Sequence, residues 1–400
     1  MKNGHFVGLL LLALFLAMTP TVVASSTWYV DGVNGSDSNN CMSSETACKT
    51  IGRAISLASS GESIMVAAAT YTENLTISFS LNVIGSGAGT TIIDGGRVGR
   101  VVTIPHSNVQ VNLANVTIRN GLGRANGGGI YNSGTLTIID SVVSGNEVMP
   151  PNCGLLSCAA SGGGIYNGGT LTVNNSTVIG NTAYESGSRA FAFGGGISNT
   201  NGGMVTINGS TVSQNSVRIK FLSSQADGGG IYNGGTVTIS NSTITGNTAS
   251  GFSAFRSGGI GNQGNLTVNN STVSGNSGGI ESLSGSTTLQ NSIVANNSGG
   301  NCHGTMSSSG YNLSSDGSCN LSHTGDLNNT DPLLGTLGNY GGPTQTIPLL
   351  SGSPAIDGGN PSGCTDGQGN LLKTDQRGMP RPDHEDTGGC DIGAYENQTD

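Results

Sequence analysis

Side chains able to carry out chemistry are scarce in this sequence. Between residues 121 and 300 the acidic residues are Asp140, Glu147, Glu185, Asp227 and Glu281. Hydrolysis of a glycosidic bond needs two carboxyl groups on either side of the scissile bond. We expect only Asp140 to lie inside a regular strand, and the neighbouring copies of its repeat offer it no acidic partner. The sequence therefore predicts no catalytic residues, although a polysaccharide lyase or related carbohydrate-active enzyme stays open as the alternative.

Cationic and aromatic side chains gather in four insertions, 147–161, 182–193, 216–227 and 248–257. If these insertions lie side by side, they form a basic, aromatic band. Aromatic rings provide amphipathic contact area, and guanidinium groups pair with carboxylates, so the band suits an acidic polysaccharide. The alternative is that the loops pack on one another and bury their rings. The predicted ligand-binding residues are Arg189, Phe191, Phe193, Arg218, Lys220, Phe221, Phe252, Phe255 and Arg256.

Two oxygen-rich loops are candidates for calcium, although no cofactor is expected overall. The segment "DGVNGSDSNN" contains Asp31, Asn34 and Asp37, and "TDGQGN" contains Asp366 and Asn370. Hard cations favour such ligands, but Asx turns use the same residues without a metal. The formal net charge of -9 disfavours nucleic acid as a partner, because binding depends on neutralising phosphates.

The candidate residues interrupt a repeat. Copies such as "GGGIYNGGTLTVNNSTVIGN" begin at residues 127, 162, 194, 228, 258 and 278. Each contains three short β-prone segments separated by Gly and Asn. Periods of this length indicate a solenoid, in which each strand pairs with its equivalent in the next copy. The sequence therefore predicts an all-β parallel β-helix.

Alternation within each copy predicts which side chains face inward. Three aliphatic columns are expected in the core: Ile130, Ile165, Ile197, Ile231, Ile260 and Ile280; Ile138, Val173, Ile207, Ile239, Val268 and Leu289; and Val143, Val178, Val212, Ile244, Val273 and Val294. Two Asn columns are expected at the corners: Asn132, Asn167, Asn199, Asn233 and Asn262; and Asn146, Asn181, Asn215, Asn247, Asn276 and Asn297. An outward row of Thr, from Thr137 to Thr288, also leaves ice binding as a third class of function.

The two ends of the chain differ from the repeats. Residues 1–24 resemble a secretory signal, with an N-terminal membrane anchor as the alternative, and no further span is expected in the mature chain. Residues 25–62 are expected to form an N-terminal cap with a helix near 50–59, residues 63–329 the coils, and residues 330–400 a C-terminal cap.

Eight cysteines fit an exported protein in an oxidising compartment. Residues far apart in the sequence of a rod lie far apart along its axis, so neighbouring cysteines are expected to pair. The expected disulfides are Cys41–Cys48, Cys153–Cys158, Cys302–Cys319 and Cys364–Cys390.

Three segments carry a family resemblance. "WYVDGVNGSDSNNC" through "YTENLTI" resembles the start of secreted right-handed parallel β-helix proteins of the pectate-lyase-like superfamily. The GGGIYN copies are similar to repeats of polymorphic outer-membrane proteins. The end, "NYGGPTQTIPLLSGSPAIDGGN" and "CDIGAYE", resembles the choice-of-anchor Q domain, in which a surface anchor usually follows; here only residues 397–400 remain.

Together these features predict a secreted or cell-surface protein that is a monomeric, right-handed β-helical rod. The expected function is non-catalytic adhesion or structure, through binding of glycan or of a neighbouring surface by the insertions.

Overall fold

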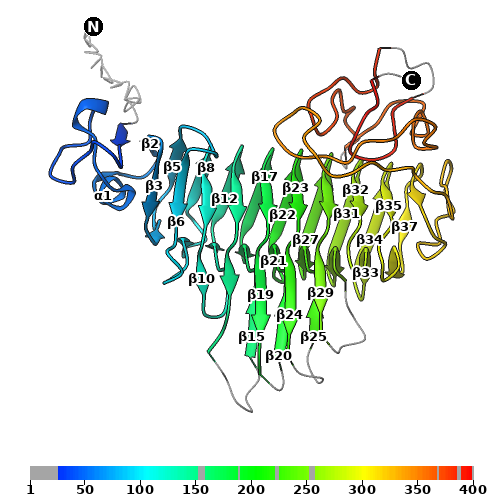
Figure 1. Cartoon of the computed structure of the whole chain (residues 1–400), viewed down its shortest axis with the longest axis horizontal. Coiled ribbons are helices and arrows are strands. Elements are labelled where there is room, and N and C mark those ends of the chain that lie inside the picture. Colours follow the sequence, from blue (N-terminus) through cyan, green and yellow to red (C-terminus); the bar gives the residue numbers. More distant parts are fainter. Residues whose placement is uncertain are drawn as a thin grey trace, which may run out of the picture.

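A computed structural model describes residues 26–151, 158–187, 190–220, 225–251, 257–366, 369–384 and 389–398. The described chain winds into an elongated rod of stacked coils, with a compact module lying along one flank and a thin projection on the opposite side (Figure 1). All pairing between named strands is parallel, as in β1 with β2 and in β12 with β17. The fold is therefore the predicted parallel β-helix, and its right-handed sense stays a prediction.

Three long sheets, A, B and C, form the rod. Sheet A contains β1 (Thr27–Val30), β2 (Glu62–Val66), β5 (Leu81–Gly85), β8 (Gln110–Ala114), β12 (Thr135–Ile139), β17 (Thr170–Asn174), β22 (Met204–Asn208), β27 (Thr236–Ser240), β31 (Asn265–Asn269), β34 (Ser286–Gln290) and β37 (Ser307–Ser308). Sheet B contains β3 (Ala69–Thr72), β6 (Thr91–Asp94), β9 (Thr117–Arg119), β13 (Val142–Ser144), β18 (Thr177–Ile179), β23 (Thr211–Ser213), β28 (Thr243–Thr245), β32 (Thr272–Ser274), β35 (Ile293–Ala295) and β38 (Leu313–Ser314). Sheet C contains β4 (Leu75–Thr76), β7 (Val102–Ile104), β11 (Ile130–Asn132), β16 (Ile165–Asn167), β21 (Ile197–Asn199), β26 (Ile231–Asn233), β30 (Ile260–Asn262), β33 (Ile280–Ser282) and β36 (Cys302–Gly304).

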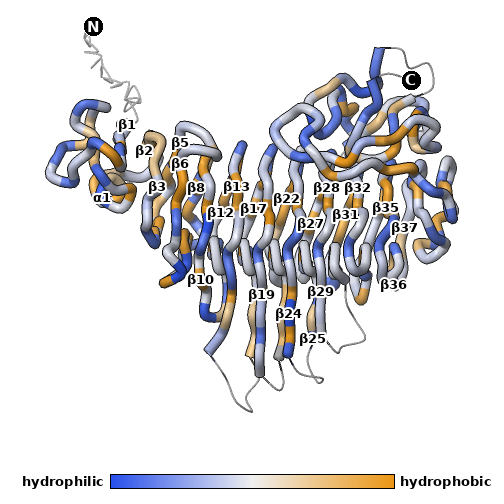
Figure 2. The backbone as a smooth tube through the Cα atoms, in the orientation of Figure 1, coloured by the Kyte–Doolittle hydropathy of each residue, from blue (hydrophilic) through white to orange (hydrophobic). Residues whose placement is uncertain are grey.

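The predicted aliphatic columns form the core of the rod. Ile130 pairs in register with Ile165, and the same match continues from copy to copy in all three sheets. Every member of the three columns is at most 1% exposed. Hydrophobic segments recur along the coils in Figure 2. Like side chains stack on like because a parallel, in-register sheet places equivalent residues directly above one another.

The two Asn columns are buried hydrogen-bonded ladders, as predicted. The Nδ2 of Asn167 donates to Oδ1 of Asn199 at 2.8 Å, and the same bond continues from Asn199 to Asn233 at 2.9 Å. In the second ladder, Asn181 donates to Asn215 at 2.9 Å. Each amide thereby satisfies the next, which removes the cost of burying an unpaired polar group.

The turns between sheets A and B contradict one expectation. Asp140 follows β12 with φ of 48°, and Asn175 and Asn241 occupy the equivalent turns with φ of 48° and 47°. Asn and Asp tolerate this left-handed conformation better than other residues with side chains. Asp140 therefore lies in a turn, and the prediction that it sits inside a strand is wrong.

At the N-terminus a short helix covers the open core. Helix α1 (Ile51–Leu57) lies within the predicted range 50–59, and a 3-10 helix that was not predicted, η1 (Ser44–Thr46), precedes it. The hydroxyl of Thr50 accepts a hydrogen bond from the backbone N–H of Arg53 and caps α1. Ile51 and Ala54 are fully buried against the first coils, so α1 closes the apolar end of the rod.

The described parts of the insertions form a two-layered projection built of strands, and we call it the fin. Sheet D contains β10 (Leu122–Gly123), β14 (Glu147–Val148), β19 (Thr182–Glu185), β24 (Ser216–Ile219) and β29 (Thr248–Ser250). Sheet E contains β15 (Cys158–Ser161), β20 (Ala190–Phe193) and β25 (Gln225–Asp227). The two sheets enclose a small apolar core made of Val148, Ala160, Ala183, Ala192, Val217, Ile219 and Ala226.

The C-terminal module, residues 330–398, covers the flank of the later coils (Figure 1). Leu349, Ala355 and Ile392 pack against Ile293 and Ala295 of β35. Further along the flank, Thr243 donates to Gln376 of the module at 2.6 Å. The module is therefore attached to the rod by both apolar packing and buried hydrogen bonds.

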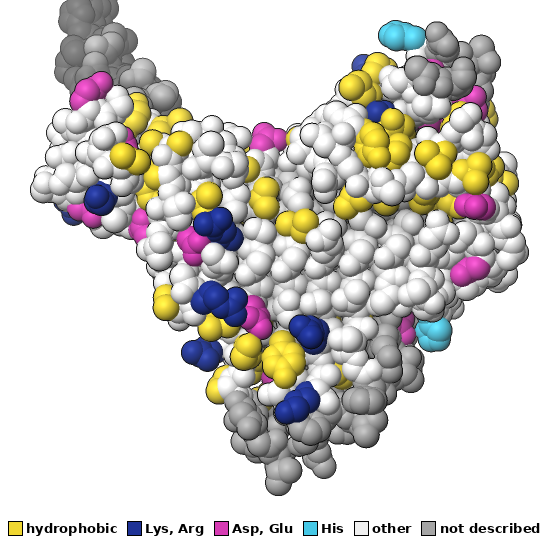
Figure 3. All heavy atoms as spheres, viewed as in Figure 1, with side chains coloured by type: hydrophobic (Ala, Val, Ile, Leu, Met, Phe, Trp, Pro, Cys, Tyr) yellow, Lys and Arg dark blue, Asp and Glu magenta, His cyan; other side chains and the backbone are white. Residues whose placement is uncertain are grey.

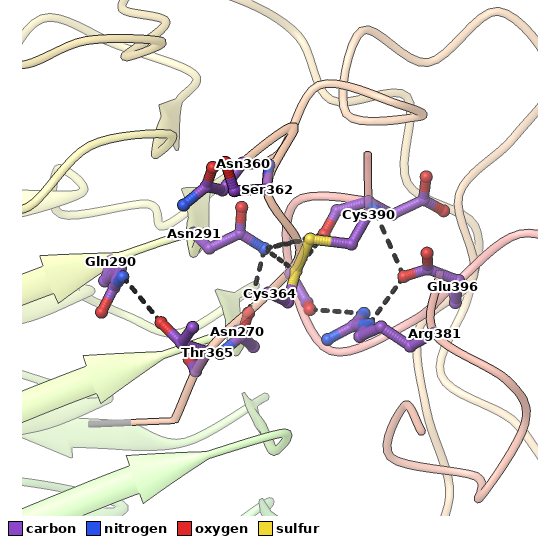
Figure 4. The surroundings of a disulfide bond; sticks show 12 residues. Asn270, Gln290, Asn291, Asn360, Ser362, Cys364, Thr365, Arg381, Cys390 and Glu396 are labelled. Carbon is purple, nitrogen blue, oxygen red and sulfur yellow. Dashed lines mark hydrogen bonds and ion pairs between the residues drawn. A yellow bond between two sulfur atoms is a disulfide. The ribbon is translucent and has the colours of Figure 1, made fainter. Parts of the chain in front are cut away.

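Inside the module a disulfide and a buried ion pair adjoin the rod. Cys364–Cys390 lies beside Asn291, whose Nδ2 donates to the carbonyl of Asp391 at 2.8 Å (Figure 4). Arg381 pairs with Glu396 at 2.6 Å, and both side chains are fully buried.

Three of the four predicted disulfides are confirmed: Cys41–Cys48, Cys302–Cys319 and Cys364–Cys390. Cys158 is also disulfide-bonded, and Cys153 lies outside the described residues.

Candidate functional site at the fin corner

Two columns of outward side chains meet where sheet E joins sheet C. On sheet E, Ser161, Phe193 and Asp227 are in register. On sheet C one outward column runs through Tyr131, Tyr166, Ser198, Tyr232, Gly261, Glu281 and His303. We call the angle between these two columns the fin corner. Thr103 pairs in register with Tyr131 and adds an eighth outward position to the sheet C column. From Thr103 to His303 the column spans seven coil steps, or about 34 Å at the usual strand spacing.

The Gly triplets of the repeat make this corner sharp. A Cβ on Gly195 would lie 2.4 Å from the carbonyl oxygen of Ser216 in sheet D and 2.5 Å from that of Gly229. Gly194, just before it, has φ of 61°. Because Gly194 and Gly195 carry no side chain, the chain can turn from the fin into sheet C at this point.

Aromatic rings line the first half of the corner. The rings of Tyr131 and Tyr166 are stacked with centroids 5.3 Å apart, and the guanidinium of Arg100 lies 4.8 Å from the Tyr131 centroid. Ser198 interrupts the row, and Phe193 then lies 4.4 Å from Tyr232. Phe191 stacks beside Phe193 and is 38% exposed. The corner therefore offers an apolar surface with phenolic groups at its edge.

Beyond Tyr232 the corner holds an unusual carboxyl group. Asp227 is fully buried, and neither of its carboxylate oxygens has a hydrogen-bond partner in the described part of the chain. Its carboxylate occupies the space above Gly261, where a Cβ would lie 2.1 Å from Oδ1. The missing side chain of Gly261 therefore makes room for Asp227.

Glu281 follows Gly261 in the column and faces a cavity of about 300 Å³. Its Oε1 lies 3.4 Å from Nδ1 of His303, while its Oε2 is buried without a partner among the described residues. Ser257, Ser277 and four glycines form most of the remaining lining. No described Lys or Arg lines this cavity.

The charge of Glu281 influences the ionisation of Asp227. Burial, and second the charge of Glu281, raise the pKa of Asp227 to about 8. Burial also raises the pKa of Glu281, although His303 opposes this shift. Near neutral pH, Asp227 therefore holds a proton. Burial and the charge of Asp227 together raise the pKa of Tyr232 to about 12.

The predicted binding residues that the structure describes do not form one band. Phe191 and Phe193 lie on the outer side of sheet E, facing the fin corner. Arg218 pairs in register with Tyr184 on the outer side of sheet D, and exposed Lys220 follows the same strand. Because the fin core separates these sheets, the described cations and rings occupy opposite faces. Arg189, Phe221, Phe252, Phe255 and Arg256 lie outside the described residues.

Charged side chains are unevenly distributed over the face shown in Figure 3. They gather over the fin and the N-terminal part, while the middle of the rod is largely uncharged. A ligand on the outer face of sheet D would meet Arg218, whereas a ligand in the fin corner would meet rings and carboxyl groups.

The expected calcium loops use their oxygens internally. Asp31 Oδ1 accepts hydrogen bonds from the N–H groups of Val33 and Asn34 at 2.8 and 3.0 Å. Asp366 accepts hydrogen bonds from Asn370 in the same manner, at 2.8 Å. The Asp31 loop is an Asx turn closed by N–H donors. No group of three His, Cys, Asp or Glu residues suited to a metal occurs in the described ranges.

The sequence did not predict that Asp227, Glu281 and Tyr232 lie near one another. Asp227 ends β25 and Glu281 lies within β33, so acidic residues do occur in strands and do come together. A signal existed in the repeat, because position 261 replaces the Tyr of "GGGIYN" with Gly and position 281 replaces it with Glu.

Comparison with solved structures agrees with the fold. The chain is similar to a structure described as pectate lyase Pel9A, with a TM-score of 0.50 and 16% identity over 94% of this chain and 98% of that one. A complex of XylC with xylose also matches, with a TM-score of 0.40 and 8% identity over 92% and 98%, which is too distant to support an argument. No family model and no curated protein matches the chain.

The fold is thus that of the pectate-lyase-like parallel β-helix proteins, and the resemblance to the choice-of-anchor Q domain stays a prediction. Three disulfides are consistent with an extracellular protein. Within the described ranges, no helix has the length and apolar character required to cross a membrane. The expected signal, residues 1–24, lies outside them.

Proposed function

We propose that this protein is a secreted or cell-surface rod that binds polysaccharide along the fin corner without cleaving it. The observation that carries the proposal is the aromatic surface at the corner, where Phe193 lies 4.4 Å from Tyr232 and Phe191 is 38% exposed. Rings with one apolar face and a polar edge suit sugars, which present both C–H and O–H groups. The extended column also suits a chain-like ligand.

The position of the charges changes the expected class of glycan. The sequence predicts an acidic polysaccharide because it places Arg and Lys in the same insertions as the rings. Arg218 instead lies on sheet D, and Glu281 lies in the fin corner. A uronic acid in the corner would meet carboxyl groups, so neutral or cationic glycans fit this surface better.

Binding can be tested with residues 25–400 on an array of neutral, acidic and aminated polysaccharides. We expect binding to neutral or aminated glycans that weakens in Phe193→Ala. Met204→Ala is the matched control, because Met204 is an exposed apolar side chain on sheet A. Silence of the folded protein across the array would refute glycan recognition at the corner.

A carbohydrate-active enzyme remains a second candidate because of one observation, the adjacent carboxyl groups of Asp227 and Glu281. Environments that push two carboxyl pKa values apart are typical of acid and base pairs in glycosidases. Any glycan that binds should therefore be incubated with the protein and assayed for new reducing ends and for unsaturated sugars. Release of either product would replace the non-catalytic proposal.

A further inference from the structure

We propose that the cavity beside Glu281 is a subsite for the ammonium group of an amino sugar. The inference rests on glycan binding at the fin corner and names the sugar class that the end of the corner selects. The cavity measures about 300 Å³, and Glu281 and His303 lie on its wall. A volume of this size is at the lower end of small-molecule sites.

First, the buried carboxyl groups of Glu281 and Asp227 are short of hydrogen-bond donors. Glu281 is 4% exposed, and its Oε2 has no hydrogen-bond partner in the described part of the chain. Asp227, its neighbour across Gly261, likewise has no hydrogen bond of regular geometry to either oxygen in the described part of the chain, although the backbone N–H groups of Gly228 and Ser257 lower its pKa. Unpaired buried acceptors are costly, and an ammonium group brings three donors and a positive charge.

The second argument is the composition of the cavity wall. Gly278, Gly279, Gly299 and Gly300 leave the backbone bare beside Glu281, so a sugar ring can approach it closely. No described Lys or Arg lines the cavity, and the titratable groups on its wall are Glu281 and His303. Asp227 is not part of the wall but interacts electrostatically with Glu281 and with Tyr232. A negatively charged sugar has no described Lys or Arg to pair with here, whereas an ammonium group faces the Glu281 carboxylate.

The third argument concerns the proton on Asp227, whose pKa is raised to about 8. At pH 7 most of the unliganded molecules therefore hold this proton. A bound ammonium group stabilises the ionised form of a nearby carboxyl group and lowers its pKa. Binding near neutral pH should therefore release part of a proton, which a neutral sugar would not do.

Calorimetry with a matched pair of ligands tests the inference. The probes are the hexamers of glucosamine and of N-acetylglucosamine, which differ in the charge of the nitrogen. At about pH 6.5 and low salt we expect the glucosamine hexamer to bind at least about tenfold more tightly. This preference should fall to within about twofold in Glu281→Gln and persist in Asp140→Asn, which removes an exposed charge in a distant turn.

Proton release supplies an independent readout. Titrations at about pH 7 in phosphate and in Tris should give different apparent enthalpies for the glucosamine hexamer but equal ones for the acetylated hexamer. Asp227→Asn should reduce the difference between buffers, because one of the groups whose protonation changes on binding is gone. Thermal unfolding of each variant checks that it is folded.

The outcomes separate this inference from the proposed function. Equal affinity for the two hexamers, or a preference that survives in Glu281→Gln, overturns the amino-sugar subsite. If neutral polysaccharides still bind through Phe193 in that case, the proposed function stands alone. If neither hexamer nor any polysaccharide on the array binds, both proposals fail.

Discussion

The carboxylate of Asp227 lies above the backbone of Gly261, where a Cβ would stand 2.1 Å from its Oδ1 and 2.4 Å from its Cγ. The two residues belong to successive coils and to different sheets. Their contact explains why the Tyr of the repeat is absent at this coil. The loss of the Tyr side chain at Gly261 therefore accompanies the acidic side chain at Asp227.

Gly261→Ala should therefore destabilise the protein by displacing Asp227, with an expected loss of about 1–3 kcal/mol in the free energy of unfolding. Urea denaturation measures this loss. In the Asp227→Ala background the same substitution should cost much less, because its closest contacts are gone. Gly168→Ala is the control, since its Cβ would meet nothing closer than 3.7 Å. Equal losses in both backgrounds would refute the contact.

The Asn ladder should be essential to the stack of coils. Asn199 accepts a hydrogen bond from Asn167 and donates one to Asn233, so Asn199→Ala leaves buried amides unpaired on both sides. We expect a loss of about 2–4 kcal/mol in urea denaturation. Asn208→Ala, which changes an exposed residue of the next strand, should be close to neutral. A small effect at Asn199 would show that water replaces the ladder.

The pH dependence of stability should report the buried acids. The pKa of Asp227 rises from 3.8 to about 8 on folding, and that of Asp391 from 3.8 to about 7, mainly because of burial. The folded state then binds more protons than the unfolded state over these ranges, so stability falls as pH rises from about 4 to about 8. Unfolding midpoints measured across this range should decline.

Asp227→Asn isolates the Asp227 contribution to this decline. At pH 8 this substitution should stabilise the protein by about 2 kcal/mol. It removes the cost of a buried charge, and the unpaired amide that it introduces offsets part of this gain. The remaining slope above pH 7 should flatten. A variant that is less stable than the wild type at pH 8 would show that the ionised carboxylate has a partner after all.

The C-terminal module should depend on its buried ion pair. Arg381→Ala leaves Glu396 without its cation in a fully buried position, and the expected loss is about 3–5 kcal/mol. Limited proteolysis should then cut the module before the coils. Lys373→Ala, at an exposed position of the same module, is the control and should keep the wild-type pattern. Equal resistance of both variants would contradict this role.

The sequence predicted the regular parts of the molecule well because in-register stacking demands the same residue type in every coil. Ile197 above Ile165 and Asn199 above Asn167 follow directly from that rule. The sequence could not predict the fin, because the insertions share no repeated sequence that would reveal their strands. It also placed Arg218 beside Phe193, because the spacing of residues does not show that a core separates two faces of a projection.

The site was hidden for a related reason. Asp227 precedes a Gly triplet and Glu281 follows a Gly pair two coils later, so they occupy different columns of the repeat. Only the sharp turn at the triplet brings the two columns face to face. A systematic comparison of each copy with the consensus would have marked residues 261 and 281, but not the contact of Gly261 with Asp227.

One measurement tests the central claim, that glycan binds on the sheet E side of the fin. It compares the affinity of Phe191→Ala/Phe193→Ala with that of Arg218→Ala for the best glycan found on the array. The account predicts that the double variant loses at least about tenfold while Arg218→Ala stays within about twofold of the wild type. Loss in Arg218→Ala with wild-type affinity in the double variant would place the ligand on the opposite face and contradict the account.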